Sequence, residues 1–289
     1  MKKLTTLLTC ICLIISTTSC SSQNRNYSSG NWGSKKVVGS NNYVTKDIKV
    51  DNFKKLSVAG STDVIFTQKS GRPDVEVYTS DNIVDLLDIK VKDNTLYIGF
   101  KKDVNVSYKK LEVRVSAEAL NGISVAGSGD IFLKNGLQTN DDLSISVAGS
   151  GDIKGSNIKC NDMKVSVAGS GDINADNITC NNLKVSVAGS GDMVLKSVTS
   201  LNNTEASVAG SGSATITGTT QTASYSVAGS GDLFTENYEA KRVNASVAGS
   251  GSIKCFATEF LKVRTSGSGK VGYKGNPELD YPKKSLYKL

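Results

Sequence analysis

Hydrophobic and polar residues alternate with a period of two through most of the chain after residue 44. Met163, Val165 and Val167 fall on one side of such a stretch, and Lys164 and Ser166 fall on the other. This period is typical of a β-strand with one buried face. Apart from one short turn, no stretch places apolar residues at helical spacing. The pattern therefore predicts an all-β protein.

The motif SVAGS recurs at a nearly fixed interval, which is the strongest signal in the chain. After Ser124 its spacings are 22, 20, 20, 21, 19 and 20 residues, and a degenerate copy, TSGSGK, covers residues 265–270. A period of about 20 indicates a solenoid. A leucine-rich repeat would need LxxLxL, and a left-handed β-helix would need hexapeptides. The repeat therefore predicts a right-handed parallel β-helix over residues 121–270, with about 20 residues per coil. The eight copies start at Ser57, Ser124, Ser146, Ser166, Ser186, Ser207, Ser226 and Ser246.

Stacking the repeats places apolar residues in columns, which we expect to form a continuous core. The column that includes the valine of each SVAGS motif is Val125, Val147, Val167, Val187, Val208, Val227 and Val247. The column that follows the motif is Ile131, Ile153, Ile173, Met193, Ala214, Leu233 and Ile253. The Gly-Ser-Gly between these columns predicts a tight bend, because glycine adopts positive φ without steric cost.

Hydrophobic and polar residues also alternate over residues 44–120, but without the fixed spacing of the repeat. This stretch predicts an irregular β portion that caps the β-helix. Open ends of a β-helix expose unpaired strand edges. We expect a hairpin turn at Asn94-Thr95 and a short helical turn at Asn82–Leu87. Residues 271–289 are expected to close the other end. The expected strands are Phe53–Gln68, Asp74–Thr79, Ile89–Lys92, Leu96–Phe100 and Leu111–Ser116.

The N-terminus has the features of a secretory signal. Lys2 and Lys3 precede an apolar run that ends at Ile15, which is too short to span a membrane. The small residues that follow, up to Ser19 and Cys20, resemble a bacterial lipobox. We therefore expect a lipoprotein signal peptide over residues 1–19 and lipidation of Cys20. An ordinary signal peptide that is cut elsewhere is the alternative.

Residues 20–43 are rich in Ser, Asn and Gly and are expected to form a polar tether.

Three cysteines remain in the body, which is too few for a disulfide framework. Cys160 and Cys180 lie 20 residues apart and should face inward on adjacent coils. Either buried thiols or a disulfide would fit this position. Cys255 has no counterpart in its column.

Composition excludes several classes of function. The chain has no histidine, which rules out His-dependent catalytic triads and His-ligated metal sites. The net charge is +7 and falls to +5 once Lys2 and Lys3 are removed. This excess is too small to indicate nucleic-acid binding. We therefore expect no nucleic-acid partner.

An aspartate follows the Gly-Ser-Gly bend in most coils. Such a column could hold Ca²⁺ or act as paired acids. The period of 20 and the single carboxylate per coil argue against both. We expect these carboxylates to accept hydrogen bonds from backbone N–H groups at the bend. The column consists of Asp130, Asp152, Asp172, Asp192 and Asp232.

Three blocks resemble a known family, the putative auto-transporter adhesin, head GIN domain family of Bacteroidetes-type lipoproteins. They are FKKLSVAGSTDVIFTQKSG (53–71), DIKVKDNTLYIGFKK (88–102) and LNGISVAGSGDI (120–131) with its copies. The resemblance covers residues 44–270. It implies a pectin-lyase-like β-helix and a role in cell adhesion. Residues 281–289 carry three lysines, and we expect attachment to come from Cys20.

These features predict a non-catalytic, lipid-anchored protein of the cell envelope, held at the outer membrane, that acts in adhesion or surface binding. The alternative is a β-helix that binds or degrades polysaccharides. Near-identical repeats and scattered arginines argue against an active site, so we expect no enzyme activity, cofactor or metal. The expected partners are the membrane, through the anchor, and host or envelope glycans or proteins. The arginines are Arg72, Arg114, Arg242 and Arg264.

Overall fold

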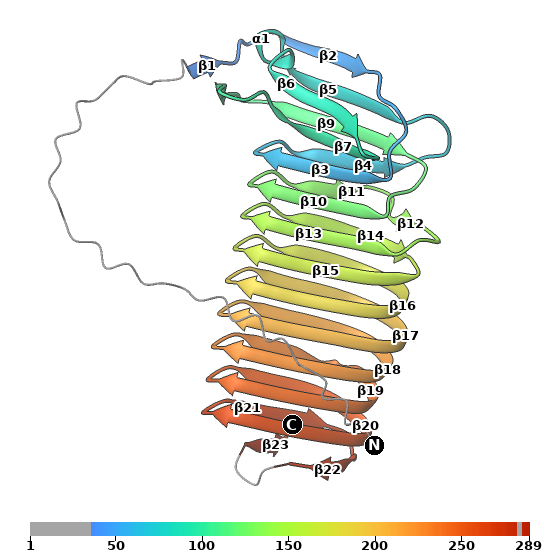
Figure 1. Cartoon of the computed structure of the whole chain (residues 1–289), viewed down its shortest axis with the longest axis vertical. Helices are drawn as coiled ribbons and strands as arrows, with labels where there is room; N and C mark the ends of the chain where they lie inside the picture. Colours follow the sequence, from blue (N-terminus) through green and yellow to red (C-terminus); the bar gives the residue numbers. More distant parts are fainter. Residues whose placement is uncertain (1–35, 282–284) are drawn as a thin grey trace, which may run out of the picture. The chain divides into compact units, whose positions relative to one another are not determined.

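A computed structural model describes residues 36–281 and 285–289. The expected signal peptide, Cys20 and residues 20–35 of the expected tether lie outside the described residues. Strands make up 72% of the described residues and helix 2%, and the strands form a β-solenoid of about eight turns (Figure 1). The prediction of an all-β solenoid is confirmed.

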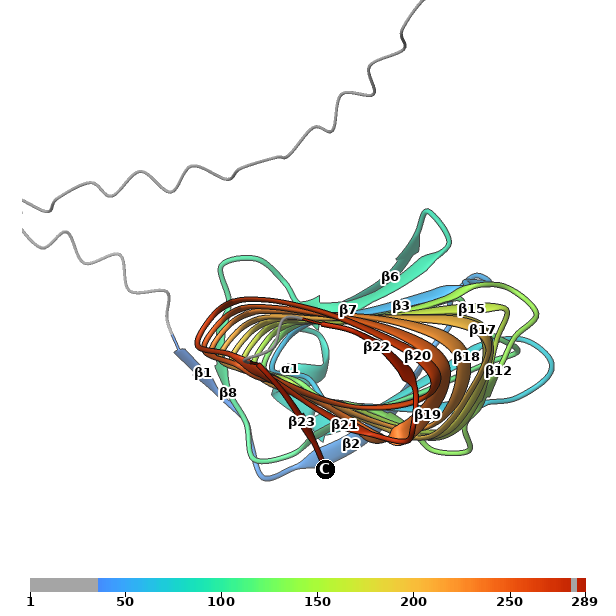
Figure 2. The ribbon, with the colours of Figure 1, turned by 90° about the horizontal axis from the view of Figure 1, so that it is seen from below.

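Two sheets face each other across the core and are joined at both sides by bends (Figure 2). The SVAG motifs form one sheet, called here the SVAG sheet, and the residues after the Gly-Ser-Gly bend form the opposite sheet. In the lower coils a single bent strand contributes to both sheets. These strands are β16 (Ile173–Gly189), β17 (Asp192–Gly210), β18 (Ser213–Gly229), β19 (Asp232–Gly249) and β20 (Ser252–Gly267).

Shorter strands build the upper coils in the same parallel register. Val125 pairs with Val147, and Val147 pairs with Val167. The SVAG strands are β3 (Lys55–Gly60), β10 (Gly122–Gly127), β13 (Leu143–Gly149) and β15 (Asp162–Gly169). The strands on the opposite side are β4 (Val64–Gln68), β11 (Ile131–Leu133), β12 (Leu137–Gln138) and β14 (Ile153–Lys159).

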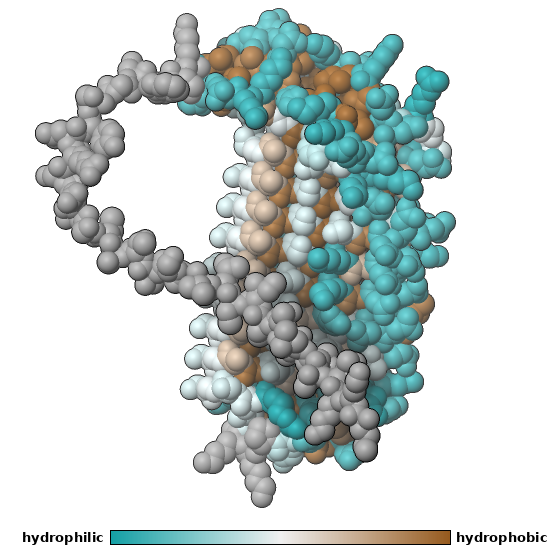
Figure 3. Space-filling view, in the orientation of Figure 1, coloured by the Kyte–Doolittle hydropathy of each residue, from teal (hydrophilic) through white to brown (hydrophobic). Residues whose placement is uncertain are grey.

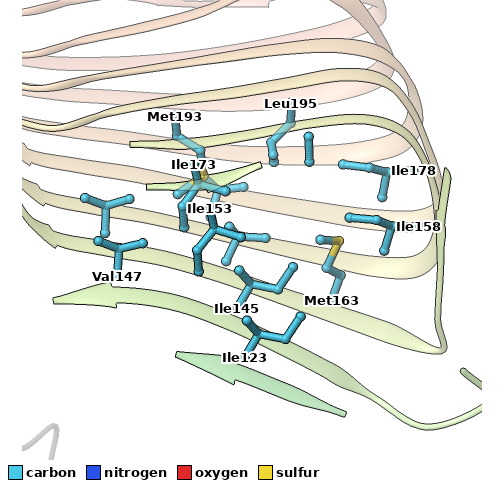
Figure 4. Close-up of a cluster of buried hydrophobic side chains, with 14 of the residues drawn as sticks. Ile123, Ile145, Val147, Ile153, Ile158, Met163, Ile173, Ile178, Met193 and Leu195 are labelled. Carbon is cyan, nitrogen blue, oxygen red and sulfur yellow. The ribbon is translucent and has the colours of Figure 1, made fainter. Parts of the chain in front are cut away.

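The expected apolar columns meet between the two sheets. Figure 4 shows Ile145 and Val147 of the SVAG sheet facing Ile153 and Ile173 of the opposite sheet. All four side chains are at most 2% exposed. Burial of these apolar side chains in each coil supplies the main driving force for folding.

Each Gly-Ser-Gly bend is held to the bend above it and has no room for a side chain. The carbonyl of Gly149 accepts hydrogen bonds from the N–H groups of Ser170 and Gly171, at 2.9 and 3.0 Å. Gly169 has a φ of +137°, and a Cβ there would lie 2.3 Å from the oxygen of Gly149. Glycine is therefore needed both for its backbone conformation and for the close stacking of the coils.

The second bend uses asparagine in the left-handed region in two successive coils. Asn157 has a φ of 56° and Asn177 a φ of 55°. Asparagine is one of the few residues other than glycine that tolerates this conformation. The side-chain amide of Asn177 donates to Oδ1 of Asn157 at 2.6 Å. This hydrogen bond joins two adjacent coils on the side of the solenoid opposite the glycine bends.

The cap is an insertion between two adjacent coils. Ser57 pairs in register with Ser124, although 66 residues separate them. Residues 69–121 therefore lie beyond the first coil rather than within the stack (Figure 1). On the opposite sheet β9 (Leu111–Ala117) pairs with β4, followed by antiparallel β5 (Asp74–Ser80) and β2 (Tyr43–Ile48). The helix α1 (Asp81–Val84) follows β5.

The SVAG sheet is extended by a hairpin. β7 (Thr95–Phe100) pairs in parallel with β3, and β6 (Leu87–Lys92) pairs antiparallel with β7. The turn lies at Asp93-Asn94, where φ is 50° and 57°. The expected turn at Asn94-Thr95 was therefore wrong by one residue. Asp93 and Asn94 tolerate the left-handed conformation, whereas the β-branched Thr95 pairs with Lys92.

Residues 36–43 belong to the folded body, which corrects the expected end of the tether at residue 43. β1 (Lys36–Val38) pairs in parallel with β8 (Asn105–Ser107). The N–H of Gly39 also donates to the carbonyl of Ser107 at 2.8 Å. Polar residues flank this three-residue strand. The alternation of hydrophobic and polar residues is therefore too short to predict the strand from the sequence.

The C-terminal strands continue both sheets by a partial coil. β21 (Lys270–Lys274) and then β23 (Leu286–Lys288) extend the opposite sheet. β22 (Glu278–Asp280) extends the SVAG sheet by pairing with Phe260–Lys262 of β20. These short strands end the stack with only three paired residues on each sheet. Short edge strands limit pairing with other chains.

Candidate functional site

The aspartate column is a hydrogen-bonded ladder that joins successive coils. Oδ1 of Asp130 accepts from the N–H of Asp152 at 2.8 Å, and Oδ1 of Asp152 accepts from the N–H of Asp172 at 3.0 Å. Asp172 in turn accepts from the N–H of Asp192 at 2.8 Å. The expectation that these carboxylates bind backbone N–H groups is confirmed. The N–H comes from the next coil rather than from the bend of the same coil.

Serines continue the ladder where the aspartate is missing. Oδ1 of Asp192 accepts from both the N–H and the hydroxyl of Ser213, at 3.0 and 2.8 Å. Asp232 accepts from Ser252 in the same way. Among residues 36–281 and 285–289, no three His, Cys, Asp or Glu side chains are grouped so that they could hold a metal ion. The ladder thus has a structural role in each coil where it occurs.

The three cysteines of the body are buried free thiols in the structure. Burial, as the main cause, raises the pKa of Cys160, Cys180 and Cys255 to about 12 each. A thiol with such a pKa is almost fully protonated at neutral pH and is a poor nucleophile. Of the two expectations for Cys160 and Cys180, the structure shows the free thiols.

A shallow groove runs along the outer surface of the SVAG sheet. Its largest hollow has a volume of about 1030 Å³ and lies over the upper coils. Ser124 and Ser146 line its floor, while Lys164 and Asp162 line its side. Two further hollows of about 620 and 450 Å³ continue it toward the C-terminus.

The three hollows share lining residues and therefore form one groove. Lys184 and Glu205 line the first and second hollows, and Ser246 and Arg264 line the second and third. Figure 3 shows this face as pale rows of small residues beside a hydrophilic side. The groove follows the long axis of the solenoid and crosses most of its coils. Such a shape suits an extended partner better than a compact ligand.

The charged side chains along the groove are mostly paired with each other. Lys184 Nζ lies 3.0 Å from Glu205 Oε2. At the lower end, Asp280 is 3.0 Å from Arg264 and 3.4 Å from Lys262. The hydrogen bond from Arg264 is the main cause that lowers the pKa of Asp280. These pairs are exposed and contribute little to stability, but they leave the groove without a dominant charge.

Tyr97 lies at the upper end of the groove and was not identified from the sequence. It is 39% exposed, lines the largest hollow and pairs in register with Ser57. Its neighbours Leu96 and Ile98 are buried. The alternation of LYI in residues 96–98 is the signal that could have placed Tyr97 on the outer surface. Sequence alternation places the serine of each repeat on the outward side of its strand, and in the structure six of the eight SVAG serines line the groove.

Cys20, the expected lipid site, lies outside the described residues. Within those residues the structure contains no helix long and apolar enough to cross a membrane. The sequence expectation of a lipid anchor is therefore untested by the fold.

Solved structures from Bacteroidetes share this architecture. A "putative lipid binding protein" from Parabacteroides distasonis ATCC 8503 is 27% identical, with a TM-score of 0.63 over 88% of this chain and 97% of that chain. A "putative adhesin" from Bacteroides fragilis NCTC 9343 is 29% identical, with a TM-score of 0.51 over 87% and 95%. A "putative adhesin" from Parabacteroides merdae ATCC 43184 is 22% identical, with a TM-score of 0.67 over 88% and 99%, and shows the shared fold.

A search of curated proteins finds no match to the chain. A family model does match, over residues 52–216 and 173–277, which together cover most of the sequence. These regions contain the SVAG strands, most of the cap and most of the groove. The chain belongs to the family described as "putative auto-transporter adhesin, head GIN domain".

Proposed function

We propose that this protein is a non-catalytic adhesin of the cell envelope, anchored by lipid on Cys20, that binds an extended partner along the groove of the SVAG sheet. The observation that carries the proposal is the continuity of the groove. The same serine position of the repeat lines both halves of the groove, and Lys164 and Lys184 line the stretch between them, so one partner chain could make similar contacts at several coils. The lining serines are Ser57, Ser124 and Ser146 in the first hollow and Ser207, Ser226 and Ser246 in the second. Membership of an adhesin family supports this role.

Repetition explains how a shallow surface could bind firmly. Each coil offers a small contact, and contacts made by one polymer after the first are effectively intramolecular. Many weak contacts can then give useful overall affinity without a deep pocket. Adhesion to a surface that displays many copies of the partner would gain further from the same effect.

The lipid anchor would hold the binding surface at the membrane. Two or three acyl chains anchor a protein stably, whereas one chain binds only marginally. The "putative lipid binding protein" among the similar structures does not change this proposal. The interior between the two sheets is filled by buried side chains such as Val147 and Ile173, which leaves the outer groove as the binding surface.

Expression of the full chain in the bacterium that encodes it, from which the gene has been deleted, tests the proposal. The wild-type chain should enter the membrane fraction and increase adherence of the cells to plates coated with mucin or with polysaccharide. The Cys20→Ala variant should leave the membrane fraction and lose the added adherence. Retention of Cys20→Ala in membranes would contradict the anchor, and unchanged adherence on deletion of the gene would contradict the adhesive role.

A separate assay tests the absence of catalysis. Purified protein incubated with pectin, xylan and starch should release no reducing ends. Depolymerisation that a single substitution abolishes would show that the protein is an enzyme, and would favour the alternative of a polysaccharide-degrading β-helix.

A further inference from the structure

An aromatic ring stands at the head of the serine column. Tyr97 of β7 pairs with Ser57 of β3, and Ser57 pairs with Ser124 of β10. The same register continues coil by coil to Ser246, which pairs with Arg264 at the lower end. The outer surface of the SVAG sheet therefore carries one column in register that begins at an exposed tyrosine and ends at an arginine. Six of its eight serines line the groove, and Ser166 and Ser186 do not.

The serine hydroxyls of this column are available to a ligand. The hydroxyl of Ser207 donates to the carbonyl of Val185 at 3.3 Å. For the other seven SVAG serines the described part of the chain offers no hydrogen-bond partner to the hydroxyl. A serine hydroxyl can donate one hydrogen bond and accept two. The column thus presents a row of donors and acceptors about 4.8 Å apart, the spacing of neighbouring strands.

Methyl groups run beside the hydroxyls. The alanines of the SVAG motifs, for example Ala148, Ala168 and Ala188, are exposed on the same face, two residues from each serine. A ligand on this surface would meet polar and apolar groups alternately. Sugar rings carry C–H groups on their faces and most of their hydroxyls at their edges, and the two kinds of group match such a surface.

The charge balance favours an uncharged ligand. In the largest hollow Lys55 and Lys164 are offset by Asp142 and Asp162, and Lys184 is paired with Glu205. A groove built for a polyanion would show an excess of lysine and arginine along its floor. Serines occupy the floor instead.

We propose that the groove binds a linear, uncharged polysaccharide along the axis of the solenoid, with one sugar ring stacked on Tyr97 and successive sugars hydrogen-bonded to the SVAG serines. The inference rests on the proposed adhesive function and specifies its ligand class. The tyrosine ring provides a large, rigid contact area at low entropic cost. The serine column would then contribute a small contact at each coil.

Affinity electrophoresis of the full mature chain, solubilised in detergent, tests the ligand. Gels contain one polymer each: hydroxyethyl cellulose, xylan or mannan as uncharged probes, and polygalacturonate or heparin as anionic probes. At least one uncharged polymer should retard the protein, and the anionic polymers should not. The Tyr97→Ser variant should bind about tenfold more weakly, whereas Tyr97→Phe, which keeps the ring, should bind as the wild type does.

Tyr287 provides the matched control. It is 41% exposed, close to the 39% of Tyr97, but it lies on β23 of the opposite sheet. Tyr287→Ser should therefore bind as the wild type does. Circular dichroism of each variant verifies that the fold is intact.

Three outcomes would overturn the inference. They are retardation by the anionic polymers alone, equal loss of binding in Tyr97→Ser and Tyr287→Ser, and no retardation by any uncharged polymer. The adherence assay on mucin distinguishes failure of the polysaccharide proposal from failure of the proposed adhesive function. Adherence to mucin that persists without polysaccharide binding would keep the adhesive role and replace the ligand class.

Discussion

Oδ1 of Asp152 accepts a hydrogen bond from the backbone N–H of Asp172, one coil further along, at 3.0 Å. The side chain of one repeat thereby supports the backbone of the next at the point where the chain leaves the glycine bend. Oδ2 of Asp152 lies 3.0 Å from Lys154, and this hydrogen bond is the main cause that raises the pKa of the lysine. The aspartate of one coil thus supports the backbone of the next coil wherever the ladder carries an aspartate.

Removal of one carboxylate from this ladder should weaken the fold. Asp172→Ala leaves the N–H of Asp192 without its acceptor and should lower the free energy of unfolding by about 1–2 kcal/mol. Asp172→Asn keeps an oxygen at the same position and should cost less than half as much. Urea denaturation measures both values. Equal losses in the two variants would show that the charge, rather than the hydrogen bond, stabilises the ladder.

Calcium should leave the stability of the wild-type protein unchanged. The carboxylates of the ladder bind backbone N–H groups, and the described residues contain no cluster suited to a metal. Melting curves with and without millimolar Ca²⁺ should coincide within about 1 °C. A rise of several degrees that disappears in Asp152→Asn combined with Asp172→Asn would contradict this interpretation.

The glycine bends allow a comparison between two similar positions. Gly60 and Gly169 both have positive φ, at +86° and +137°, but only Gly169 has a carbonyl in the way of a Cβ. Gly60→Ala should cost about 1–2 kcal/mol from its backbone conformation. Gly169→Ala should cost at least about 1 kcal/mol more, because the coil above must move. Equal losses in chemical denaturation would show that stacking does not require glycine.

Two buried tyrosines in the core should respond differently to loss of the hydroxyl. Tyr238 shares a 2.7 Å hydrogen bond with Thr204. The hydroxyl of Tyr225 makes no hydrogen bond of good geometry within the described residues, because the neighbouring Thr235 hydroxyl donates to the carbonyl of Lys254. Tyr238→Phe should cost about 1 kcal/mol, and Tyr225→Phe should be neutral or stabilising. A similar loss in both variants, measured by thermal unfolding, would show that Tyr225 has a partner in solution.

Alkaline pH should destabilise the protein. The unfolded thiols of Cys160, Cys180 and Cys255 ionise near pH 9.0, whereas burial raises their pKa in the folded state to about 12. The folded state therefore holds more protons between pH 9 and 12, and stability falls as the pH rises through that range. A triple Cys→Ala variant should show a shallower fall in melting temperature above pH 9. An identical slope would contradict the contribution of these thiols.

The repeats of this fold could be predicted from the sequence because each coil repeats the same local signals. The valine column, the glycine bends and the aspartate ladder recur at a spacing of about 20 residues, so their register follows from counting. The second bend carried a comparable signal in Asn157 and Asn177, which lie 20 residues apart.

The cap could not be predicted in this way. The pairing of Ser57 with Ser124 spans an insertion, and the antiparallel strands β2 and β5 pair through contacts with no local repeat. Tyr97 joins the groove only because β7 continues the SVAG sheet. Alternation predicts that the side chain of Tyr97 faces outward. Only the three-dimensional fold shows which strand lies beside β7. Alternation therefore predicts the outward serines of the candidate site but not its aromatic end.

Adherence of cells that carry substitutions on the two faces of one strand tests most directly whether the groove is the binding surface. Ser226 and Thr215 both lie on β18, but Ser226 lines the groove and Thr215 faces outward from the opposite sheet. Ser226→Arg should place a bulky charge in the groove and reduce adherence to a polysaccharide-coated plate at least about fivefold. Thr215→Arg should leave adherence unchanged. Equal adherence of the two variants, or a greater loss with Thr215→Arg, would contradict binding along the SVAG sheet.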